Sequence, residues 1–365
     1  MTVAWLKEPH EDKTRFFQAI AKADHGGRAM RTWTVSFRSH LQTTERAEEC
    51  LARAKKQPRW FGGRWLKRAF LKGRYNRARR YFGKNQDQVA VCWQGLTGAR
   101  RAFMMGAIDA GADTLFAELA PLPGFKTLDP LGVNAEGSVP QDREAYDNTI
   151  ARPDILAGIA AGFQPRASRR SDVGQAGTLP KNTEPFIFVP LQVPNDSQML
   201  LFADWVQSSK GFVEALAAAS QHLPDGWHLR LKEHPSSKIR LTRQIEKAIK
   251  NGARIILDNA TDSFEQLKAA RAVLTVNSSM GLQAMFFDKP VITTGRAFYA
   301  MPGLTSHASS PKRLADLLDQ SEQLSFDPDF RARFLTWLAT DYYIKEDELG
   351  YDRLHLQNRL AEART

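Results

Sequence analysis

The sequence predicts two α/β domains joined by a linker, with a cleft between the domains. In both halves of the chain, apolar segments of strand length alternate with segments of helical pattern, which is typical of this class. A stretch rich in Gly, Ser, Arg and Pro separates the halves, and 365 residues are enough for two cores. We therefore expect an N-terminal domain at 1–165, a flexible linker at 166–184, a C-terminal domain at 185–325 and a mostly helical tail at 326–365 that packs back on the first domain.

The first domain contains one clear strand–helix–strand unit. Residues 89–93 form a buried strand, a glycine-containing turn leads into a helix at 99–110, and a second strand at 114–117 ends at Glu118. Around this unit we expect strands at 2–6 and 32–37, a helix at 13–23, a long loop at 121–140 and a helix at 142–161.

The net charge of +11 comes largely from one segment of the first domain. Residues 53–84 hold 13 Lys or Arg, no Asp or Glu, and interleaved aromatic residues, and we expect a helix broken near Gly62-Gly63 and Gly73. Three interpretations are open: a solvated helix whose aromatic residues pack on the protein, a patch that binds an anionic membrane surface, and a nucleic-acid site. Since no nucleic-acid-binding motif accompanies the segment, no nucleic-acid partner is expected.

The composition excludes several classes of protein. The 42% apolar and 25% charged residues are typical of a soluble globular protein, and the longest apolar runs are too short to cross a bilayer. The N-terminus is charged too early for a signal peptide. Cys50 and Cys92 have no metal or redox spacing, so we expect reduced thiols and a cytoplasmic location. The sequence also lacks a P-loop and a dinucleotide-binding glycine motif.

The second domain shows a regular alternation of strands and helices. Its expected strands are 186–191, 227–232, 254–257, 272–276 and 290–293. Its expected helices are 197–208, 210–221, 238–250, 262–269, 280–287 and 311–319. Because ligands of open α/β sheets lie at the carboxyl ends of the strands, polar residues at those ends are the candidates for function.

The first candidate cluster follows the strand at 186–191. Asp196 lies just past the strand, ahead of a helix that starts at Ser197, and Gln192 precedes it. Asp before a helix is commonly an N-cap, which is one interpretation of Asp196. The other is a nucleophile or a base facing the cleft.

The second cluster ends the strand at 227–232. Lys232 and His234 are two residues apart, so the alternation of a strand places both on one face, and Pro235 ends the strand. A cation and an imidazole on one side can donate hydrogen bonds to a phosphate. A histidine that only closes a loop is the alternative.

The third cluster, Asn277-Ser278-Ser279-Met-Gly281, lies between a buried strand and a helix. Free N–H groups at a helix start bind anions, the serine hydroxyls add donors, and we expect Gly281 to let the backbone approach a ligand closely. A plain capping turn is the alternative. Arg296 follows the next strand and is expected to add a cation to the same rim.

Glu118 is the candidate contributed by the first domain. It ends a strand, and we expect it to face the cleft. Paired with Asp196 it can supply the second carboxylate of a sugar-transfer reaction, although a lone Glu at a strand end is also a common surface residue.

These motifs together resemble the capsule polysaccharide biosynthesis and export family, whose characterised members are retaining β-Kdo glycosyltransferases. The resemblance is carried by Gln192-Val-Pro-Asn-Asp196-Ser, Lys232-Glu-His234-Pro235, Asn277-Ser-Ser-Met-Gly281-Leu and Gly295-Arg296-Ala-Phe-Tyr. Trp93-Gln-Gly-Leu-Thr-Gly, Glu118 and Asp129-Pro-Leu-Gly-Val-Asn134 extend it into the first domain. The chain departs from the pattern at Gln283, where a Glu is expected, and the first 85 residues match poorly.

The resemblance implies a two-domain GT-B-like fold, CMP-β-Kdo as the donor and a double displacement that keeps the β configuration. Asp196 would be the nucleophile, and Lys232 and His234 would hold the CMP phosphate. Ser278, Ser279 and the helix start at Gly281 would bind the phosphate or the Kdo carboxylate, and Glu118 would act on the acceptor hydroxyl. With Asp196, Glu118 and His234 catalytic, the substrate-binding set comprises Gln192, Lys232, Asn277, Ser278, Ser279, Gly281 and Arg296.

The resulting hypothesis is a cytoplasmic glycosyltransferase that works on a glycan or glycolipid acceptor, with residues 53–84 holding it to the anionic inner membrane. No cofactor and no metal ion are expected. Asp327-Pro-Asp329 matches the Asp-x-Asp pattern of metal-dependent glycosyltransferases, but it precedes a helix and is interpreted as a cap. Two alternatives stay open: a glycosyltransferase of the same shape that uses a UDP- or GDP-sugar, and a non-catalytic protein that binds an anionic polymer.

Overall fold

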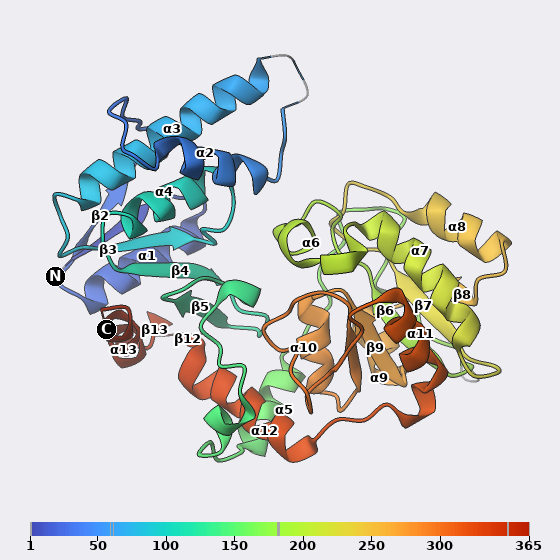
Figure 1. Cartoon of the computed structure of the whole chain (residues 1–365). Coiled ribbons are helices and arrows are strands. Elements are labelled where there is room, and N and C mark those ends of the chain that lie inside the picture. The colour runs from blue at the N-terminus through green and yellow to red at the C-terminus, as the bar shows by residue number, and fades with distance from the viewer. Residues whose placement is uncertain (1, 59, 61, 181–182, 349, 365) are drawn as a thin grey trace. The chain divides into compact units, whose positions relative to one another are not determined.

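The computed structural model shows two α/β units, each with its own sheet (Figure 1). It describes residues 2–58, 60, 62–180, 183–348 and 350–364, so Arg59 and Phe61 of the basic segment and Lys181 and Asn182 of the expected linker lie outside the described residues. Unit 1 comprises 1–120, 124–139 and 338–365, and unit 2 comprises 121–123 and 140–337.

The sheet of unit 1 combines a parallel half with an antiparallel half. Its described strands are β1 (Val3–Leu6), β2 (Gly27–Met30), β3 (Val89–Trp93), β4 (Thr114–Leu119), β5 (Phe125–Asp129), β12 (Ile344–Asp347) and β13 (Gly350–Tyr351). They lie in the order β13-β12-β5-β4-β3-β1-β2, and β1 to β4 pair in parallel while β5, β12 and β13 run antiparallel to their neighbours. The C-terminal residues therefore extend the sheet that the N-terminus begins.

Two layers of helices cover this sheet. They are α1 (Glu11–Ala23), α2 (Thr43–Ala52), α3 (Gly63–Phe82), α4 (Gly98–Ile108) and α13 (Arg353–Glu362). On one face, α1 and α13 bury Phe17 and Leu356 against alternate strand residues such as Val91. On the other side, Tyr75 of α3 packs with Met105 of α4 and with α2. Alternation along each strand thus supplies apolar side chains to both layers.

The basic segment contains one long helix, α3, which begins at Gly63, in agreement with the break expected near Gly62-Gly63. Helix α3 continues through Gly73, contrary to the expected break, because Gly73 makes room for the preceding chain: a Cβ there would lie 2.8 Å from Cβ of Val35. The expected strand at 32–37 is also wrong, since these residues run irregularly along α3 and the strand is β2. Trp33 is 82% exposed, Phe37 93% and Trp65 64%.

Unit 2 has an all-parallel sheet among its described residues. Its strands are β6 (Phe186–Pro190), β7 (His228–Lys232), β8 (Ile255–Leu257), β9 (Ala272–Thr275), β10 (Val291–Thr293) and β11 (Ser306–His307). They lie in the order β11-β10-β9-β6-β7-β8, so β6 sits between β7 and β9. The carboxyl ends of these three strands therefore meet at one edge of the sheet.

Helices flank both faces of this sheet. They are α5 (Pro153–Ala161), α6 (Ser197–Phe202), α7 (Ser209–Ala219), α8 (Thr242–Lys250), α9 (Ser263–Ala269), α10 (Ser279–Met285), α11 (Pro311–Asp319) and α12 (Pro328–Trp337). Leu216 of α7 and Leu318 of α11 pack on Ile187 and Leu229 of the strands. No helix among the described residues of the chain is long and apolar enough to cross a membrane.

The boundaries between the parts differ from the expected ones at three points. Residues 140–165 belong to unit 2, and so do residues 326–337 of the expected tail. Residues 338–365 belong to unit 1, as expected, and add two strands as well as a helix. The described part of the expected linker is not a free tether. Its backbone is tied to the loops after β7 and β8 by Arg169 N–H to Pro235 O at 2.9 Å and Gly174 N–H to Asn259 O at 2.7 Å. We call residues 164–177 the strap.

Two further local predictions have clear outcomes. Asp327 caps α12, since its Oδ1 accepts the Phe330 N–H at 3.0 Å and its Oδ2 pairs with Arg143 at 2.6 Å. The loop expected at 121–140 contains β5, and the helix expected at 142–161 is shortened to α5 after a 3-10 turn at Arg143–Tyr146. Tyr146 is fully buried against Phe334 and Trp337, so packing on α12 fixes this turn.

Candidate functional site

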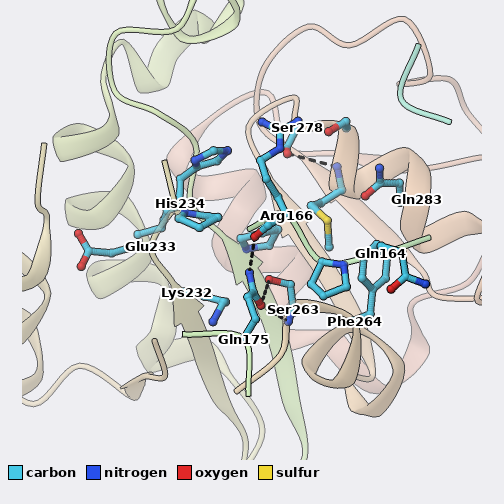
Figure 2. A pocket seen from close by; sticks show the side chains of 16 residues that line it. Gln164, Arg166, Gln175, Lys232, Glu233, His234, Ser263, Phe264, Ser278 and Gln283 are labelled. Atoms are coloured by element: carbon cyan, nitrogen blue, oxygen red, sulfur yellow. Dashed lines mark hydrogen bonds between the residues drawn. The ribbon is translucent and has the colours of Figure 1, made fainter. Parts of the chain in front are cut away.

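A cavity of about 160 Å³ lies at the carboxyl edge of the unit 2 sheet. Figure 2 shows its wall, which combines the strap, the loop after β7, the start of α9 and the start of α10. Polar groups reach it from all four segments: Arg166 and Gln175 from the strap, His234, Ser263, and Ser278 with Ser279. The structure thus brings His234, Ser278 and Ser279 together, as the strand order requires.

His234 reaches the cavity as a neutral imidazole. Its Nδ1 accepts the backbone N–H of Ser236 at 3.1 Å, so the proton of the neutral ring is on Nε2. Burial, with the nearby charge of Arg166, lowers the pKa of His234 to about 4, and the charge of Asp196 opposes this shift. At neutral pH the ring therefore offers one N–H donor without a net charge.

Lys232 has a different role from the predicted one. Its side chain is buried, and Nζ donates to three backbone carbonyls: Gly174 at 2.8 Å, Asn259 at 3.1 Å and Thr261 at 2.6 Å. An ammonium has three donors, so none is left for the predicted contact with a phosphate. Burial lowers the pKa of Lys232. This residue fastens the strap to the sheet edge.

Glu233 completes the attachment of the strap. It is buried and accepts hydrogen bonds from Arg170 at 3.0 Å, the Leu241 N–H at 2.6 Å, Thr242 at 2.7 Å and Asn259 at 3.1 Å. These donors outweigh the effect of burial and hold the pKa of Glu233 below its ordinary value. A basic, glycine-containing stretch that looked flexible is ordered by this buried carboxylate and by Lys232.

Gln192 and Asn277 bind each other rather than facing the cavity. Gln192 Nε2 donates to Asn277 Oδ1 at 2.8 Å, and Asn277 N–H donates back to Gln192 Oε1 at 3.2 Å. Asn277 Nδ2 donates to the carbonyls of Gln198 and Phe202 at 3.2 and 3.0 Å. The pair joins the ends of β6 and β9 to α6, and neither residue lines the cavity, so the predicted substrate-binding role fits neither.

The serine cluster combines capping with access to the cavity. Ser278 Oγ accepts the Met280 N–H at 3.2 Å as the cap of α10, and Ser279 is exposed. Gly281 does not serve a ligand: a Cβ there would lie 2.4 Å from the Tyr299 hydroxyl, which donates to the Ser278 carbonyl at 2.5 Å. The predicted close approach at Gly281 is therefore to Tyr299.

Asp196 is the N-cap of α6, as the simpler interpretation held. Its Oδ1 accepts from Ser197 Oγ at 3.0 Å and from the Gln198 N–H at 3.4 Å. It is partly exposed, it lies beyond the carboxyl end of β6, and its charge acts on His234. Capping and chemistry use the same carboxylate, so the cap does not exclude the predicted catalytic role.

The cation of this site is Arg166 and not Arg296. Arg296 pairs with Asp204 at 3.2 Å, donates to the Leu201 carbonyl at 3.0 Å and stacks on Phe202, away from the cavity wall. Arg166 lines the cavity, is exposed, and forms no ion pair with any residue that the structure describes. Sequence reasoning missed it because the strap was interpreted as a linker. The signal available in the sequence was the position of Arg166, shortly before β6, the first strand of unit 2.

Glu118 lies at the carboxyl end of β4 in unit 1. Its Oε2 accepts from Asn134 Nδ2 at 2.9 Å, and Asn134 has a positive φ of 58°. The loop that carries Asn134 is held by the buried Asp129. Among the residues that the structure describes, no group of three or more His, Cys, Asp or Glu is placed to hold a metal ion.

The fold is shared with a known transferase. The beta Kdo 2,7 transferase of Thermosulfurimonas dismutans KpsC aligns over 100% of both chains with a TM-score of 0.58 and 13% sequence identity. The predicted GT-B-like class, with two α/β units, is thereby confirmed.

Sequence comparison points to one family. Residues 164–324 match the model of the capsule polysaccharide biosynthesis protein family, which confirms the predicted resemblance over the part of the chain that forms the cavity. Protein FixF of Sinorhizobium fredii is 30% identical over 236 residues, 64% of this chain and 55% of FixF. Capsule polysaccharide modification protein LipB of Neisseria meningitidis is 31% identical over 126 residues, 33% of this chain and 30% of LipB. The chain thus matches about half or less of the length of these relatives.

Proposed function

We propose that the protein is a glycosyltransferase of capsule or related surface-glycan synthesis that transfers a Kdo-like sugar from a CMP-linked donor to a glycan or glycolipid acceptor. The observation that carries the proposal is the cavity at the carboxyl edge of the unit 2 sheet, because the polar side chains in its wall include donors that can bind an anion. The family match covers this region, and the fold is that of a Kdo transferase.

The cavity suits the phosphate end of such a donor. Its volume of about 160 Å³ is below the roughly 300–1,000 Å³ of pockets that enclose a whole small molecule, so we assign it one part of the donor. The Arg166 guanidinium would offset part of the charge on the phosphate of CMP as it leaves, and the His234 Nε2–H and the serine hydroxyls would donate hydrogen bonds to it. Since these groups meet the charge of the leaving group, the proposal includes no metal ion, and EDTA should leave the transfer rate unchanged.

The chemistry we propose is a double displacement. The Asp196 carboxylate forms a bond to the anomeric carbon while the bond from this carbon to the phosphate oxygen breaks, and CMP leaves with the electron pair. The acceptor hydroxyl then attacks the same carbon, the bond to Asp196 breaks, and the hydroxyl proton passes to a base. The family resemblance makes Glu118 the candidate for this base.

The donor is tested first. CMP-Kdo generated in the reaction mixture should support transfer, and CMP should raise the melting temperature more than UDP or GDP. A shift with UDP or GDP and none with CMP would remove the Kdo proposal and favour a nucleotide-diphosphate sugar. No shift with any nucleotide, together with polymer binding that falls steeply with salt, would favour the non-catalytic alternative.

The nucleophile is tested with a substitution that keeps the helix cap. Asn caps a helix about as well as Asp, so Asp196→Asn should preserve α6 while it removes the carboxylate. We expect the transfer rate to fall by about a thousand-fold or more. The matched control is Asp262→Asn, at the cap of α9, where the carboxylate accepts the N–H groups of Phe264 and Glu265. Wild-type activity in Asp196→Asn would show that Asp196 is not the nucleophile and only caps α6.

We further propose that the protein works at the anionic inner surface of the membrane. Supporting this, the segment 53–84 carries 13 basic residues and no acidic ones, and Trp60 and Trp65 in it are 62% and 64% exposed. Basic residues attract anionic lipid, and exposed aromatic rings enter the interface. Tyr75 and Phe82 of the same segment are buried, so the interpretation that its aromatic residues pack on the protein holds for only part of them.

A further inference from the structure

Unit 1 holds a second hollow, of about 590 Å³, that is lined by cations. It lies between the end of α3, the turn after α4 and the irregular segment that runs along α3. Arg38, His40, Arg79, Arg80 and Lys84 line it, and Asp109 is the one acidic residue in its wall. A volume of this size is within the range of small-molecule sites.

The cations of this hollow are not neutralised by the chain. Both carboxylate oxygens of Asp109 are taken by Arg46, at 2.9 and 2.8 Å, and Tyr75 donates to it at 2.8 Å. Arg79 and Arg80 form no ion pair with a residue in the described parts of the chain, and the same holds for Arg38 and Lys84. Four positive side chains therefore line the hollow without an ion-pair partner among the described residues, and the one carboxylate in the wall, Asp109, acts on Arg79 only through its charge.

His40 gives a second sign of a missing partner. Its Nε2 is buried and has no hydrogen-bond partner within the described chain. Burial, with the charges of Arg79 and Arg38, lowers the pKa of His40, so the ring is neutral at pH 7 and adds no charge to the wall. Buried ring nitrogens are normally hydrogen-bonded, which makes this orphan informative.

The hollow lies apart from Glu118 within unit 1. Helix α4 begins after the carboxyl end of β3 and returns to the start of β4, so the turn at Asp109–Gly111 lies at the amino edge of the parallel strands. Glu118 lies at the opposite, carboxyl end of β4. The hollow is therefore a different site from the edge that carries the proposed base.

Exposed apolar residues flank the cationic wall. Phe37 is 93% exposed and Leu41 97%, and in the sequence they lie on either side of Arg38 and His40. The segment is anchored to α3 by Ser36 N–H to Gly73 O at 2.9 Å and by Thr43 to Asn76 at 2.6 Å. Cations without an ion-pair partner can bind the anionic head groups of a phospholipid membrane, and exposed apolar side chains can enter its interface. This anchored segment presents both kinds of side chain next to each other.

We propose that this hollow binds the phosphate of an anionic phospholipid head group, while Phe37 and Leu41 enter the lipid interface. The proposal deepens the membrane association proposed above by naming a head-group site outside the region of the sugar chemistry. It fails separately from the transferase proposal, because transfer to a water-soluble acceptor does not depend on it.

The test uses the full chain with a water-soluble lipid and with vesicles. Titration with dihexanoyl-phosphatidylglycerol should shift the ring resonances of His40, and Arg79→Gln with Arg80→Gln should weaken this binding about ten-fold or more. The matched control removes two charges from α3 outside the hollow, as Arg64→Gln with Lys72→Gln, and should change the affinity less than two-fold. Phe37→Ser with Leu41→Ser should lower binding to phosphatidylglycerol vesicles yet preserve the His40 shift.

Three results would overturn the proposal. The first is an equal loss of lipid binding in the hollow pair and the control pair, which would indicate surface charge alone. The second is equal binding to vesicles that contain phosphatidylglycerol or the same charge density of oleate, which carries no phosphate. The third result has two parts: inorganic phosphate binds as tightly as the lipid, and the variant Arg79→Gln with Arg80→Gln binds vesicles like the wild type. Together they would identify the hollow as a site for free phosphate. Melting curves establish that each variant is folded.

Discussion

In both units, a buried charged side chain at the end of a strand holds a loop that lies at a candidate site. In unit 1 this is the fully buried Asp129, which accepts from the N–H groups of Leu131, Gly132 and Ser138 and from the hydroxyls of Ser138 and Tyr342. In unit 2 it is Lys232, which donates to the carbonyls of Gly174, Asn259 and Thr261. The first holds the loop of Asn134, the partner of Glu118, and the second holds the strap that carries Arg166.

The difference between them is one of location. Lys232 lines a cavity and so invites a functional interpretation, whereas Asp129 is not among the residues that line the cavity of unit 2 or the hollow of unit 1. Both are saturated by the chain itself, because the three donors of the ammonium are used and the carboxylate accepts five bonds. A charged residue at a strand end is free for a ligand only when its hydrogen-bonding capacity is not already used by the fold.

The largest expected effect breaks the attachment of the strap. Lys232→Met keeps the length of the side chain and leaves three carbonyls without their donor, so we expect unit 2 to lose about 3–5 kcal/mol in free energy of unfolding. Urea unfolding followed by fluorescence measures it. A variant with wild-type stability that fails only to bind CMP would restore the predicted phosphate contact and contradict the structural role.

The corresponding change in unit 1 is Asp129→Asn. An amide keeps the shape but replaces one acceptor oxygen by a donor that faces N–H groups, so we expect a loss of about 2–4 kcal/mol. Asp142→Asn is the control, since Asp142 is exposed in the same connection. If both variants unfold at the same urea concentration, the loop does not depend on Asp129.

The regular part of the fold was predictable because its signals are local. In unit 2, apolar strands and caps such as Asp262 and Ser310 define each element within a few residues, and β6, β7 and β9 lie where the pattern placed them. The rule that ligands lie at the carboxyl ends of such strands was enough to predict the edge that holds His234 and Ser279. The cap, one of the two interpretations of Asp196, was recognisable for the same reason, whereas its predicted catalytic role stays a prediction.

What failed depends on contacts distant in sequence. The strap is ordered by Glu233 and Lys232, and its own composition resembles that of a flexible linker. Helix α3 passes through Gly73 because Val35 packs there, and no local pattern reports this contact. The roles of Gly281 and Asn277 likewise depend on Tyr299 and Gln192, which a list of motifs does not pair.

A smaller effect concerns the neutral histidines of unit 2. His228 is buried and stacks on Phe186, and burial, with the charges of Arg230 and Arg254, lowers its pKa to about 4. In the unfolded chain His228 takes up a proton near pH 6.5. Its contribution to the free energy of unfolding therefore falls as the pH drops from about 6.5 towards 4, and it is constant above that range. His228→Phe should remove on the order of 2 kcal/mol of this fall, measured as the difference between urea curves at pH 7 and pH 4.5. Parallel curves for variant and wild type would show that His228 is protonated in the folded state.

The smallest effect separates the arginine that lines the cavity from the one that the sequence favoured. Arg166→Gln should weaken CMP binding about ten-fold and change the free energy of unfolding by less than about 0.5 kcal/mol, because its guanidinium is exposed and has no ion pair within the described chain. Arg296→Gln removes the same charge from an exposed side chain that pairs with Asp204, and it should leave CMP affinity unchanged. Calorimetric titration with CMP, at one salt concentration, measures both. The reverse pattern would show that the nucleotide lies along α6 rather than in the cavity beneath the strap. Equal losses of CMP affinity would show that both arginines act only through the overall positive charge and that neither contacts the nucleotide.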